Sequence, residues 1–456
     1  MEGKGLGDDR ARPAGRLMPR LRSPTAFAWL WLSEIVFDFG AALATFAFGT
    51  WVFQHTGSAE QFAHVVLCSV VPAFVFAPLA GALADGFDRR AVMLVSDGAV
   101  AALVALLAVV VFQDRLAVWH LYAFNALVAT FGAFRTPAYL SVVSAIVPAE
   151  RLARANGLIG FGKGAALVAA PWLASGLVAR DGLRGVLPVH LALVVAATVC
   201  VAMAAIRLRH ALPPPARGAG FKLAGGPGQA VSTSWDYFRR EPSMRRLAIY
   251  ALGTEALFIL VSEMITPMVL SSHSSRTLGQ VMSCGALGGL IGHLLPMWRR
   301  MGRPSMGPVL WANLMLSVCV VLAGWISTPV GWCACAFVGM AAASLSMTCT
   351  RSLWMRHFPS DRQGSLFAML GASQQLLFCA VMLVGSRLGE HVLEPALAPS
   401  GRWADSLGSL IGTGPGRGFA VLFLVCGTAC ALWSSLALVN GRSQAQRESK
   451  RRRNPA

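Results

Sequence analysis

Repeated apolar runs, most of them about 20 residues long or longer, limit how this chain can fold more than any other feature. In a bilayer every backbone N–H and C=O group needs a partner within the chain, so spans of this length must be helical. The sequence therefore predicts an all-α integral membrane protein with twelve transmembrane helices. We expect these helices at residues 26–53, 60–82, 91–112, 117–146, 156–179, 186–206, 246–270, 277–298, 308–327, 329–350, 364–387 and 418–439.

The charged residues indicate how the spans are oriented. Only 13% of the 456 residues are charged, but the net charge is +18. With the N-terminus placed inside, the predicted inner segments hold 30 Lys and Arg residues and the outer segments hold seven, while Arg135 and Lys163 lie inside spans. Cytoplasmic loops retain basic residues, so this asymmetry predicts that both termini are cytoplasmic. It also accounts for the positive charge without a nucleic-acid partner, which we do not expect.

The chain divides into two related halves. The longest polar interruption, 207–245, contains a Pro-Pro-Pro run and several glycines, as is typical of a linker. Where the fourth and the tenth span lead into the next loop, an Arg (Arg135, Arg351) is followed by a Pro (Pro148, Pro359), which indicates a duplicated six-span unit. We therefore predict two pseudo-symmetric six-helix bundles. The expected segments are a basic cytoplasmic N-terminal tail at 1–25, bundles at 26–206 and 246–440, a cytoplasmic linker at 207–245, and a basic cytoplasmic C-terminal tail at 441–456.

A polar cluster interrupts the apolar sequence between the second and third spans. It contains Gly81, Leu83, Asp85, Arg89 and Arg90. This spacing resembles the signature loop of the major facilitator superfamily. Together with the turn Thr-Gly-Ser-Ala at 56–59 and the stretch VPAERLARANGL, it is most similar to the branch that contains the enterobactin exporter and macrolide efflux permeases.

The resemblance implies the twelve-helix fold of this family and secondary active transport. It also implies an inner gate between the two halves, formed by Gly81, Asp85, Arg89 and Arg90. The alternative is that Arg89 and Arg90 only anchor the cytoplasmic ends of the spans. In the fifth span, Gly157 and Pro171 match an exporter pattern whose other glycine positions are occupied by small residues, so we expect close helix packing there.

Ionisable residues within the spans are the strongest candidates for function, because each costs about 2.5–3.5 kcal/mol to insert. Glu34 and Asp38 are four residues apart and share one helix face. We predict that Asp38, Glu34 and Glu255 couple transport to protons, with Arg135 as an electrostatic partner. The alternative is a permanent ion pair between the first span and Arg135 or Lys163.

Further residues are expected to contact the substrate or its charge. They are Lys163, Glu263, Phe37, Phe258 and Gln374. Asp97, near the inner end of its span, is expected to be solvated or paired. The sequence has no GxxxxGK[ST] phosphate loop, so the energy should come from an ion gradient. We expect no cofactor and no metal site, because the ten cysteines lie in apolar runs and no His has zinc-ligand spacing.

These features predict a proton-coupled exporter of a small organic molecule that works by alternating access. Its substrate would be a siderophore or an amphipathic drug. An uptake symporter, a non-transporting membrane sensor or scaffold, and a polytopic membrane enzyme are the alternatives, the last without any recognisable catalytic cluster. We expect a monomer surrounded by lipid in a bacterial inner membrane.

Overall fold

A computed structural model describes residues 24–208, 235, 237–298, 305–358 and 363–453. Within the helices, the side chains at 77–86, 149–150, 153, 296–298, 363–365, 368 and 440–453 are outside the description. Twelve of the described helices are long and apolar enough to cross a membrane, as the sequence predicts.

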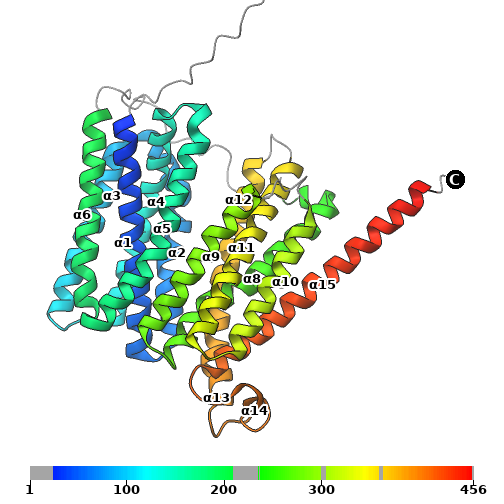
Figure 1. The fold of residues 1–456 in the computed structure, drawn as a ribbon. Coiled ribbons are helices and arrows are strands. Elements are labelled where there is room, and N and C mark those ends of the chain that lie inside the picture. The colour runs from blue at the N-terminus through cyan, green and yellow to red at the C-terminus, as the bar shows by residue number, and fades with distance from the viewer. Residues whose placement is uncertain (1–23, 209–234, 236, 299–304, 359–362, 454–456) are drawn as a thin grey trace, which may run out of the picture.

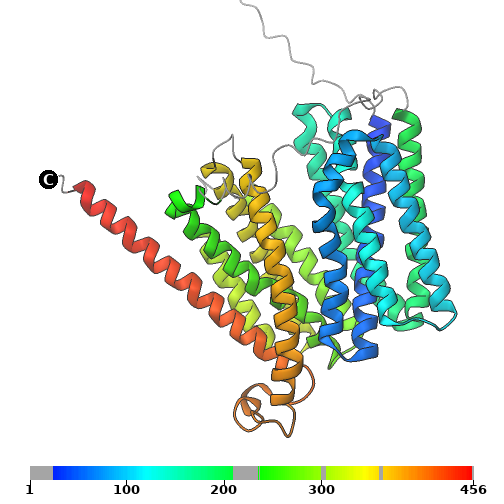
Figure 2. The same ribbon diagram turned by 180° about the vertical axis from the view of Figure 1, so that it is seen from behind.

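The first six long helices precede the predicted linker. They are α1 (Pro24–Thr56), α2 (Ala59–Gly86), α3 (Arg89–Phe112), α4 (Val118–Ile146), α5 (Ala149–Asp181) and α6 (Leu183–Leu208). The other six follow it. They are α8 (Pro242–Leu270), α9 (Ser275–Trp298), α10 (Met306–Trp325), α11 (Pro329–His357), α12 (Gln363–Leu388) and α15 (Arg417–Arg453). Figures 1 and 2 show these sets as two bundles side by side, here called the N-terminal and C-terminal bundles.

The two bundles repeat one arrangement of helices. In the N-terminal bundle, α1 packs on α5 and α6, α2 packs on α4, and α3 packs on α4 and α6. In the C-terminal bundle, α8 packs on α12 and α15, α9 packs on α11, and α10 packs on α11 and α15. Each of these pairings in one bundle has its counterpart in the other when α1 is matched with α8. The duplication inferred from the sequence is therefore present in the packing.

The contacts between the bundles follow the same symmetry. Helix α5 packs on α9, α2 packs on α12, and α1 meets α8. The α5–α9 contact is close, since a Cβ atom on Gly279 would overlap the Ser175 side chain and lie 2.8 Å from the carbonyl oxygen of Pro171. Ala170 and Ala174 of α5 are fully buried. The close packing predicted from small residues in the fifth span is confirmed.

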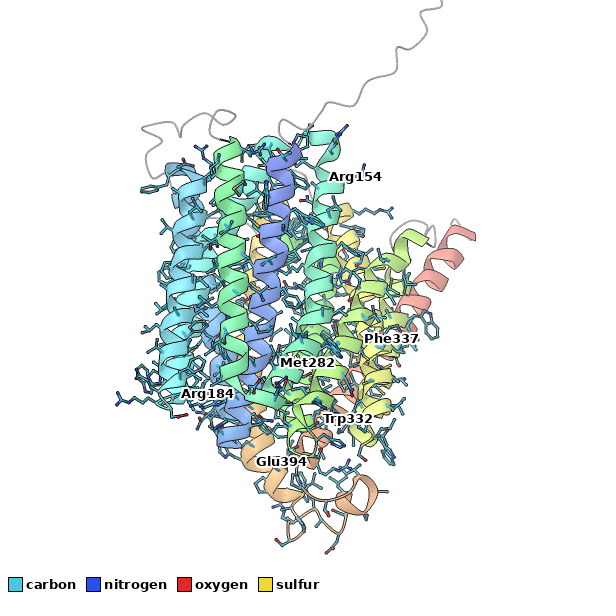
Figure 3. The ribbon with its side chains drawn as sticks, turned by 60° about the vertical axis from the view of Figure 1, so that its left-hand side comes forward. Arg154, Arg184, Met282, Trp332, Phe337 and Glu394 are labelled. Carbon is cyan, nitrogen blue, oxygen red and sulfur yellow. The ribbon has the colours of Figure 1, made fainter. Side chains whose placement is uncertain are left out.

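Large apolar side chains cover the outside of both bundles, which is the surface expected to face hydrocarbon. Trp119, Trp172 and Leu432 are each more than 60% exposed. Figure 3 shows that the polar side chains gather near the two ends of the bundles, with Arg154 at the end near the termini and Arg184 and Glu394 at the opposite end. The molecule thus has two polar faces separated by an apolar belt.

The segment after α12, which had no assigned role in the sequence, is ordered at the face opposite the termini. It contains a π-helix, η1 (Gly389–Leu393), and two short helices, α13 (Glu394–Ala396) and α14 (Leu407–Ile411). The Glu394 carboxylate accepts hydrogen bonds from the backbone N–H groups of Gly416 and Phe419, both at 3.2 Å. Since the N-terminus of a helix carries positive partial charge, Glu394 stabilises the start of α15.

Candidate functional site

A buried cluster of charges joins α1, α3 and α4. The Arg135 side chain on α4 donates from Nε to Oδ1 of Asp97 on α3, at 2.6 Å. It also donates from Nη1 to Oε2 of Glu34 on α1, at 2.5 Å. The side chains of Arg135 and Asp97 are 3% and 0% exposed, and that of Glu34 is 15% exposed. The guanidinium group therefore holds three helices of the N-terminal bundle together through charge-assisted hydrogen bonds.

An aromatic ring completes the surroundings of the guanidinium group. The centre of the Arg135 guanidinium lies 4.1 Å from the centroid of the Phe37 ring, within the range of a cation–π contact. Three buried polar atoms nearby lack a hydrogen-bond partner among the described residues: Nη2 of Arg135, Oδ2 of Asp97 and the hydroxyl oxygen of Tyr139. Unsatisfied polar atoms in a buried site are costly, and each of these three can bind a water molecule.

Asp38 lies one turn beyond Glu34 on α1 and differs from it in its partners. Among the described residues Asp38 makes no ion pair, and its side chain is partly exposed. The charges of Glu34, Lys163 and Arg135 all act on its carboxylate. Lys163 itself is exposed on α5. Helix α1 thus carries one acid, Glu34, that is paired with Arg135, and a second acid, Asp38, that has no ion pair among the described residues.

A cavity of about 580 Å³ adjoins this cluster. It is bordered by side chains of α1, α2 and α4, namely Phe37, Ala73, Val128, Ala129, Gly132, Ala133, Thr136 and Pro137. The lining is apolar apart from the Thr136 hydroxyl, and its volume is within the range of pockets that hold small organic molecules. Phe37 belongs both to the cavity wall and to the surroundings of Arg135, so it connects the cavity with the charge cluster.

Within the described part of the C-terminal bundle there are acids but no charge cluster comparable to the one around Arg135. Glu255 on α8 accepts a hydrogen bond from Nε2 of Gln374 on α12, at 2.7 Å. Glu263, two turns further along α8, has no hydrogen bond or ion pair among the described residues. Phe258 lines a narrow crevice between α8, α10 and α15 and not the larger cavity. The structure thus brings Glu255 and Gln374 together and leaves Glu263 and Phe258 apart from them.

The gate residues inferred from the sequence are described only in part. Gly81 and Asp85 belong to α2, but their side chains lie outside the described residues. Arg90 donates from Nε and Nη2 to Asp88, at 3.0 and 2.9 Å, and from Nη1 to the carbonyl oxygen of Leu208 at the end of α6, at 3.1 Å. The Arg90 guanidinium holds the pKa of the Asp88 carboxyl below its usual value. Arg90 therefore connects α3 to α6 within one bundle.

Sequence reasoning gave too little weight to two residues of the site. Of the two outcomes expected for Asp97, solvated or paired, the structure shows the second, since Asp97 is completely buried and paired with Arg135, a partner that the sequence did not name. Tyr139, one turn beyond Arg135 on α4, had not been considered at all. The signal for Asp97 was available, because an acid nine residues into an apolar helix needs a partner. Nothing in the local sequence of Tyr139 separates it from an ordinary packing residue.

Comparison with known proteins supplies the wider context for this geometry. A family model described as "Major Facilitator Superfamily" matches residues 30–382. The chain is 27% identical over 315 residues to the multidrug efflux pump Tap of Mycolicibacterium fortuitum, which covers 66% of this chain and 74% of that protein. It is 27% identical over 180 residues to macrolide efflux protein A of Streptococcus pyogenes, which covers 40% of this chain. That match spans only 44% of the streptococcal protein.

Solved structures share the fold at low sequence identity. A nucleoside transporter, NupG (D323A mutant), superposes with a TM-score of 0.64 at 12% identity, covering 90% of this chain and 99% of that chain. A bacterial homologue of the human lysosomal transporter Spinster, in an inward-facing and unoccupied conformation, superposes with a TM-score of 0.63 at 15% identity. The match covers 91% of this chain and 97% of that chain. A bacterial homologue of the iron transporter ferroportin, in an inward-facing state, superposes with a TM-score of 0.59 at 17% identity. The match covers 90% of this chain and 98% of that chain.

Proposed function

The chain belongs to the Major Facilitator Superfamily, and from this premise we propose that it is a proton-coupled exporter of a small organic molecule. It is an integral membrane transporter with efflux pumps among its relatives. The observation that carries the proposal is the asymmetry of the first span. Glu34 is bonded to Arg135, whereas Asp38, which follows the cavity residue Phe37, has no ion pair among the described residues.

The two acids of α1 have different roles in this proposal. Carboxylates one turn apart repel each other in a low-dielectric site, so a proton on Asp38 relieves the repulsion and its loss restores it. Glu34 and Asp97 hold Arg135 in place, and the guanidinium charge limits the cost of an ionised Asp38. Binding and release of one proton at Asp38 then change the net charge of the site by one. This change couples the proton gradient to the equilibrium between conformations.

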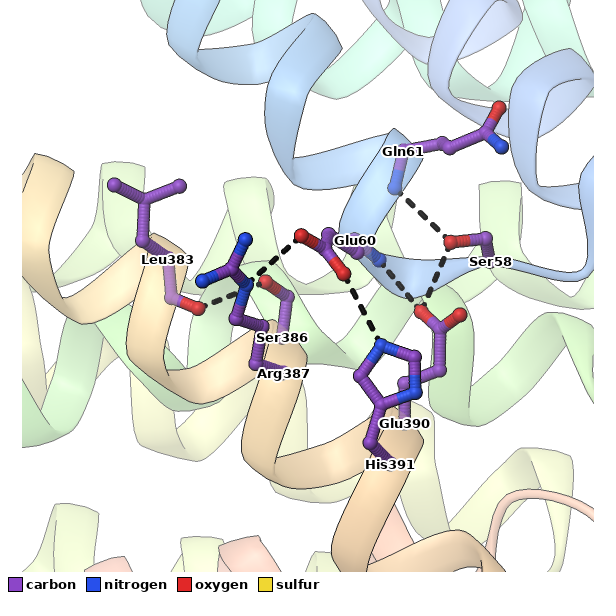
Figure 4. Close-up of polar contacts among 8 residues, drawn as sticks. All are labelled: Ser58, Glu60, Gln61, Leu383, Ser386, Arg387, Glu390 and His391. Atoms are coloured by element: carbon purple, nitrogen blue, oxygen red, sulfur yellow. Dashed lines mark hydrogen bonds and ion pairs between the residues drawn. The ribbon is translucent and has the colours of Figure 1, made fainter.

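The distribution of basic residues orients the molecule in the proposal. With 30 Lys and Arg residues in the segments on the side of the termini and seven on the other side, the termini are cytoplasmic. The turn between helices α1 and α2 and the end of α12 then lie at the outer face. The described hydrogen bonds and ion pairs between the bundles all lie at that face, for example the pair Arg387–Glu60 (Figure 4). In this proposal the molecule is closed at the outer face, which is an inward-facing arrangement, and it resides in a bacterial inner membrane.

The cavity indicates the kind of substrate. Its wall is apolar, with the Phe37 ring on one side and the charges of the Arg135 cluster behind it. Such a site suits an amphipathic organic molecule of moderate size. The relatives are named for macrolide and multidrug efflux. We place an amphipathic drug ahead of a siderophore on these grounds, with Glu255 and Gln374 as a second polar contact on the opposite bundle.

Reconstitution tests the proposal directly. Purified protein is placed in vesicles that contain a pH-sensitive dye, and a panel of macrolides, cationic dyes and siderophores is offered. An exporter moves protons in the direction opposite to the substrate, and this is the expected result. Movement of protons together with substrate would establish an uptake symporter instead. A chain that binds compounds without moving protons or substrate would be a sensor or scaffold, and the proposal would fail.

A further inference from the structure

Two cysteine side chains face each other across neighbouring helices of the C-terminal bundle. They are Cys284 on α9 and Cys333 on α11, here called the thiol pair, and their side chains interact directly. Both thiols are free, as are those of the other cysteines. The pairing is not visible in the sequence, because α10 separates the two helices along the chain.

The packing of α9 on α11 sets the thiol pair in register. A Cβ atom on Gly288 would overlap the backbone of Phe337, and one on Gly292 would overlap the backbone of Ala341. Each helix advances by four residues from the first contact to the second, so the two helices run parallel and stay close over this turn. One turn nearer the start of both helices, the same register brings the two thiols together. Backbone geometry therefore supports their contact.

Two other cysteine pairs approach each other less directly. Cys335 acts on Cys319, and Cys430 acts on Cys426, only through charge at a distance. Cys335 lies two positions beyond Cys333 on α11, so its side chain points to the other side of that helix. Cys426 and Cys430 are one turn apart on one helix, where Cβ atoms are about 5–6 Å apart, whereas a disulfide needs about 3.5–4.5 Å. The thiol pair is thus the one best placed to form a covalent bond.

The thiol pair lies where a small reagent can reach it. Both side chains are partly exposed. Figure 3 shows Met282 and Trp332, which are close to the pair in the chain, in the half of the molecule toward Glu394 and away from Arg154. In the orientation proposed above this is the outer half. The space outside a bacterial inner membrane is oxidising, and disulfides form and persist there.

A metal ion fits the thiol pair less well than a disulfide does. A protein zinc site takes three or four side-chain ligands, and the pair supplies two. Among the described residues, no group of three or more His, Cys, Asp or Glu side chains is arranged to hold a metal ion. The chemistry that remains for two adjacent thiols is oxidation.

We propose that the thiol pair is a redox-active site, which a small disulfide oxidises to a disulfide that joins α9 to α11. The thiolate of one cysteine attacks a sulfur atom of the small disulfide, which forms a mixed disulfide and releases one thiol. The thiolate of the other cysteine then attacks the cysteine sulfur of the mixed disulfide, which forms the bond between the helices and releases the second thiol. The protons of the two cysteines pass to the two released thiols. The inference goes beyond transport and takes from the proposed function only the orientation.

Oxidation would act on a helix that takes part in two contacts. Helix α9 packs on α11 within its bundle and on α5 of the other bundle. A disulfide fixes the rotation of α9 against α11, and so it stabilises the side of the C-terminal bundle that meets α5. The cross-link between residues 284 and 333 also restricts the unfolded chain. The oxidised protein should therefore unfold several degrees above the reduced protein.

The test treats the full chain in detergent with a dipyridyl disulfide, whose thiopyridone product is measured by absorbance. One variant keeps Cys284 and Cys333 and has serine in place of every other cysteine. It should release two thiopyridone molecules per chain and retain no pyridyl group, as the mass of the intact protein will show. The matched control keeps Cys284 and Cys335 instead. Its cysteines should end as pyridyl adducts without a bond between them.

The parent chain gives a second measurement that needs no replaced cysteines. After oxidation and alkylation of the remaining thiols, proteolysis without reductant should yield a cross-linked peptide pair that contains Cys284 and Cys333. Cys333→Ser should abolish both this product and the rise in melting temperature. Pyridyl adducts on both cysteines without a cross-link, or a different cysteine pair as the main product, would overturn the inference. A protein that forms the disulfide but moves neither protons nor substrate when reduced would refute only the proposed function.

Discussion

Nε of Arg135 lies 2.6 Å from Oδ1 of Asp97, and both side chains are almost completely excluded from solvent. The same guanidinium group is bonded to Glu34, so one positive charge faces two negative charges inside the N-terminal bundle. This arrangement holds Glu34 in a fixed pair and leaves Asp38 as the acid of α1 that has no ion pair among the described residues.

Asp38→Asn should abolish proton movement coupled to substrate while the protein still folds. The Asn amide keeps the shape of the Asp side chain, but it cannot bind and release a proton as a carboxylate does. The measurement is the dye response of reconstituted vesicles on addition of a transported compound. Asp405→Asn, a change at an exposed acid of the segment after α12, is the matched control and should leave coupling intact. Coupling that survives in the Asp38 variant would remove Asp38 from the mechanism.

Asp97→Ala should destabilise the protein by about 3–5 kcal/mol, because it leaves a buried guanidinium without one of its partners. The melting temperature of the purified protein in detergent reports the loss. Asp114→Ala removes an exposed partner of Arg184 and should cost no more than about 1 kcal/mol. Equal losses of stability in the two variants would show that the buried Arg135–Asp97 pair contributes no more to stability than the exposed Arg184–Asp114 pair.

Phe37→Ala should weaken transport of amphipathic compounds, since the ring lines the cavity and lies over the Arg135 guanidinium. We expect an increase in KM of several-fold. Phe258→Ala removes an equal volume from the crevice between α8, α10 and α15 and should lower stability with little change in KM. Initial rates at several substrate concentrations separate the two effects. A KM unchanged in Phe37→Ala would exclude the cavity as the substrate site.

Gly288→Ala should be destabilising, by about 1–3 kcal/mol, although alanine favours helices. A Cβ atom at this position of α9 would overlap the backbone carbonyl group of Phe337 on α11, and backbone cannot move aside as a side chain can. Gly160→Ala is the control, since a Cβ atom there meets open space. Thermal unfolding of both variants should give a lower melting temperature for the first only. A stable Gly288 variant would mean that α9 and α11 can separate at little cost.

The architecture could be predicted from the sequence because its causes are local. Spans as long as Pro24–Thr56 and Arg89–Phe112 must be helical wherever their neighbours lie, since lipid offers no partner to the backbone. Helix ends were also found closely, as at Phe112, Ile146 and Leu270. The acids of α1 could be identified because an ionisable side chain stands out in an apolar run whatever it contacts.

Arg135 could be predicted as a partner of the α1 acids, and its pair with Glu34 is present, but the other contacts of the site could not be predicted. Asp97 was expected to be solvated or paired, but its partner Arg135 could not be identified, because the rotation of α3 decides which helix Asp97 faces. Glu60 was overlooked because an acid at the start of a helix is ordinary, and its significance comes from Arg387, which is 327 positions away.

The sequence by itself determined that this chain crosses the membrane twelve times in two related halves, because hydrophobic length and the demand for internal backbone hydrogen bonds act on each segment separately. Only the tertiary structure decided which charges meet, which acid stays free and where the bundles are joined. Those outcomes depend on how each helix is rotated and inclined against its neighbours. That orientation is set by packing among many distant side chains at once, and no single segment encodes it.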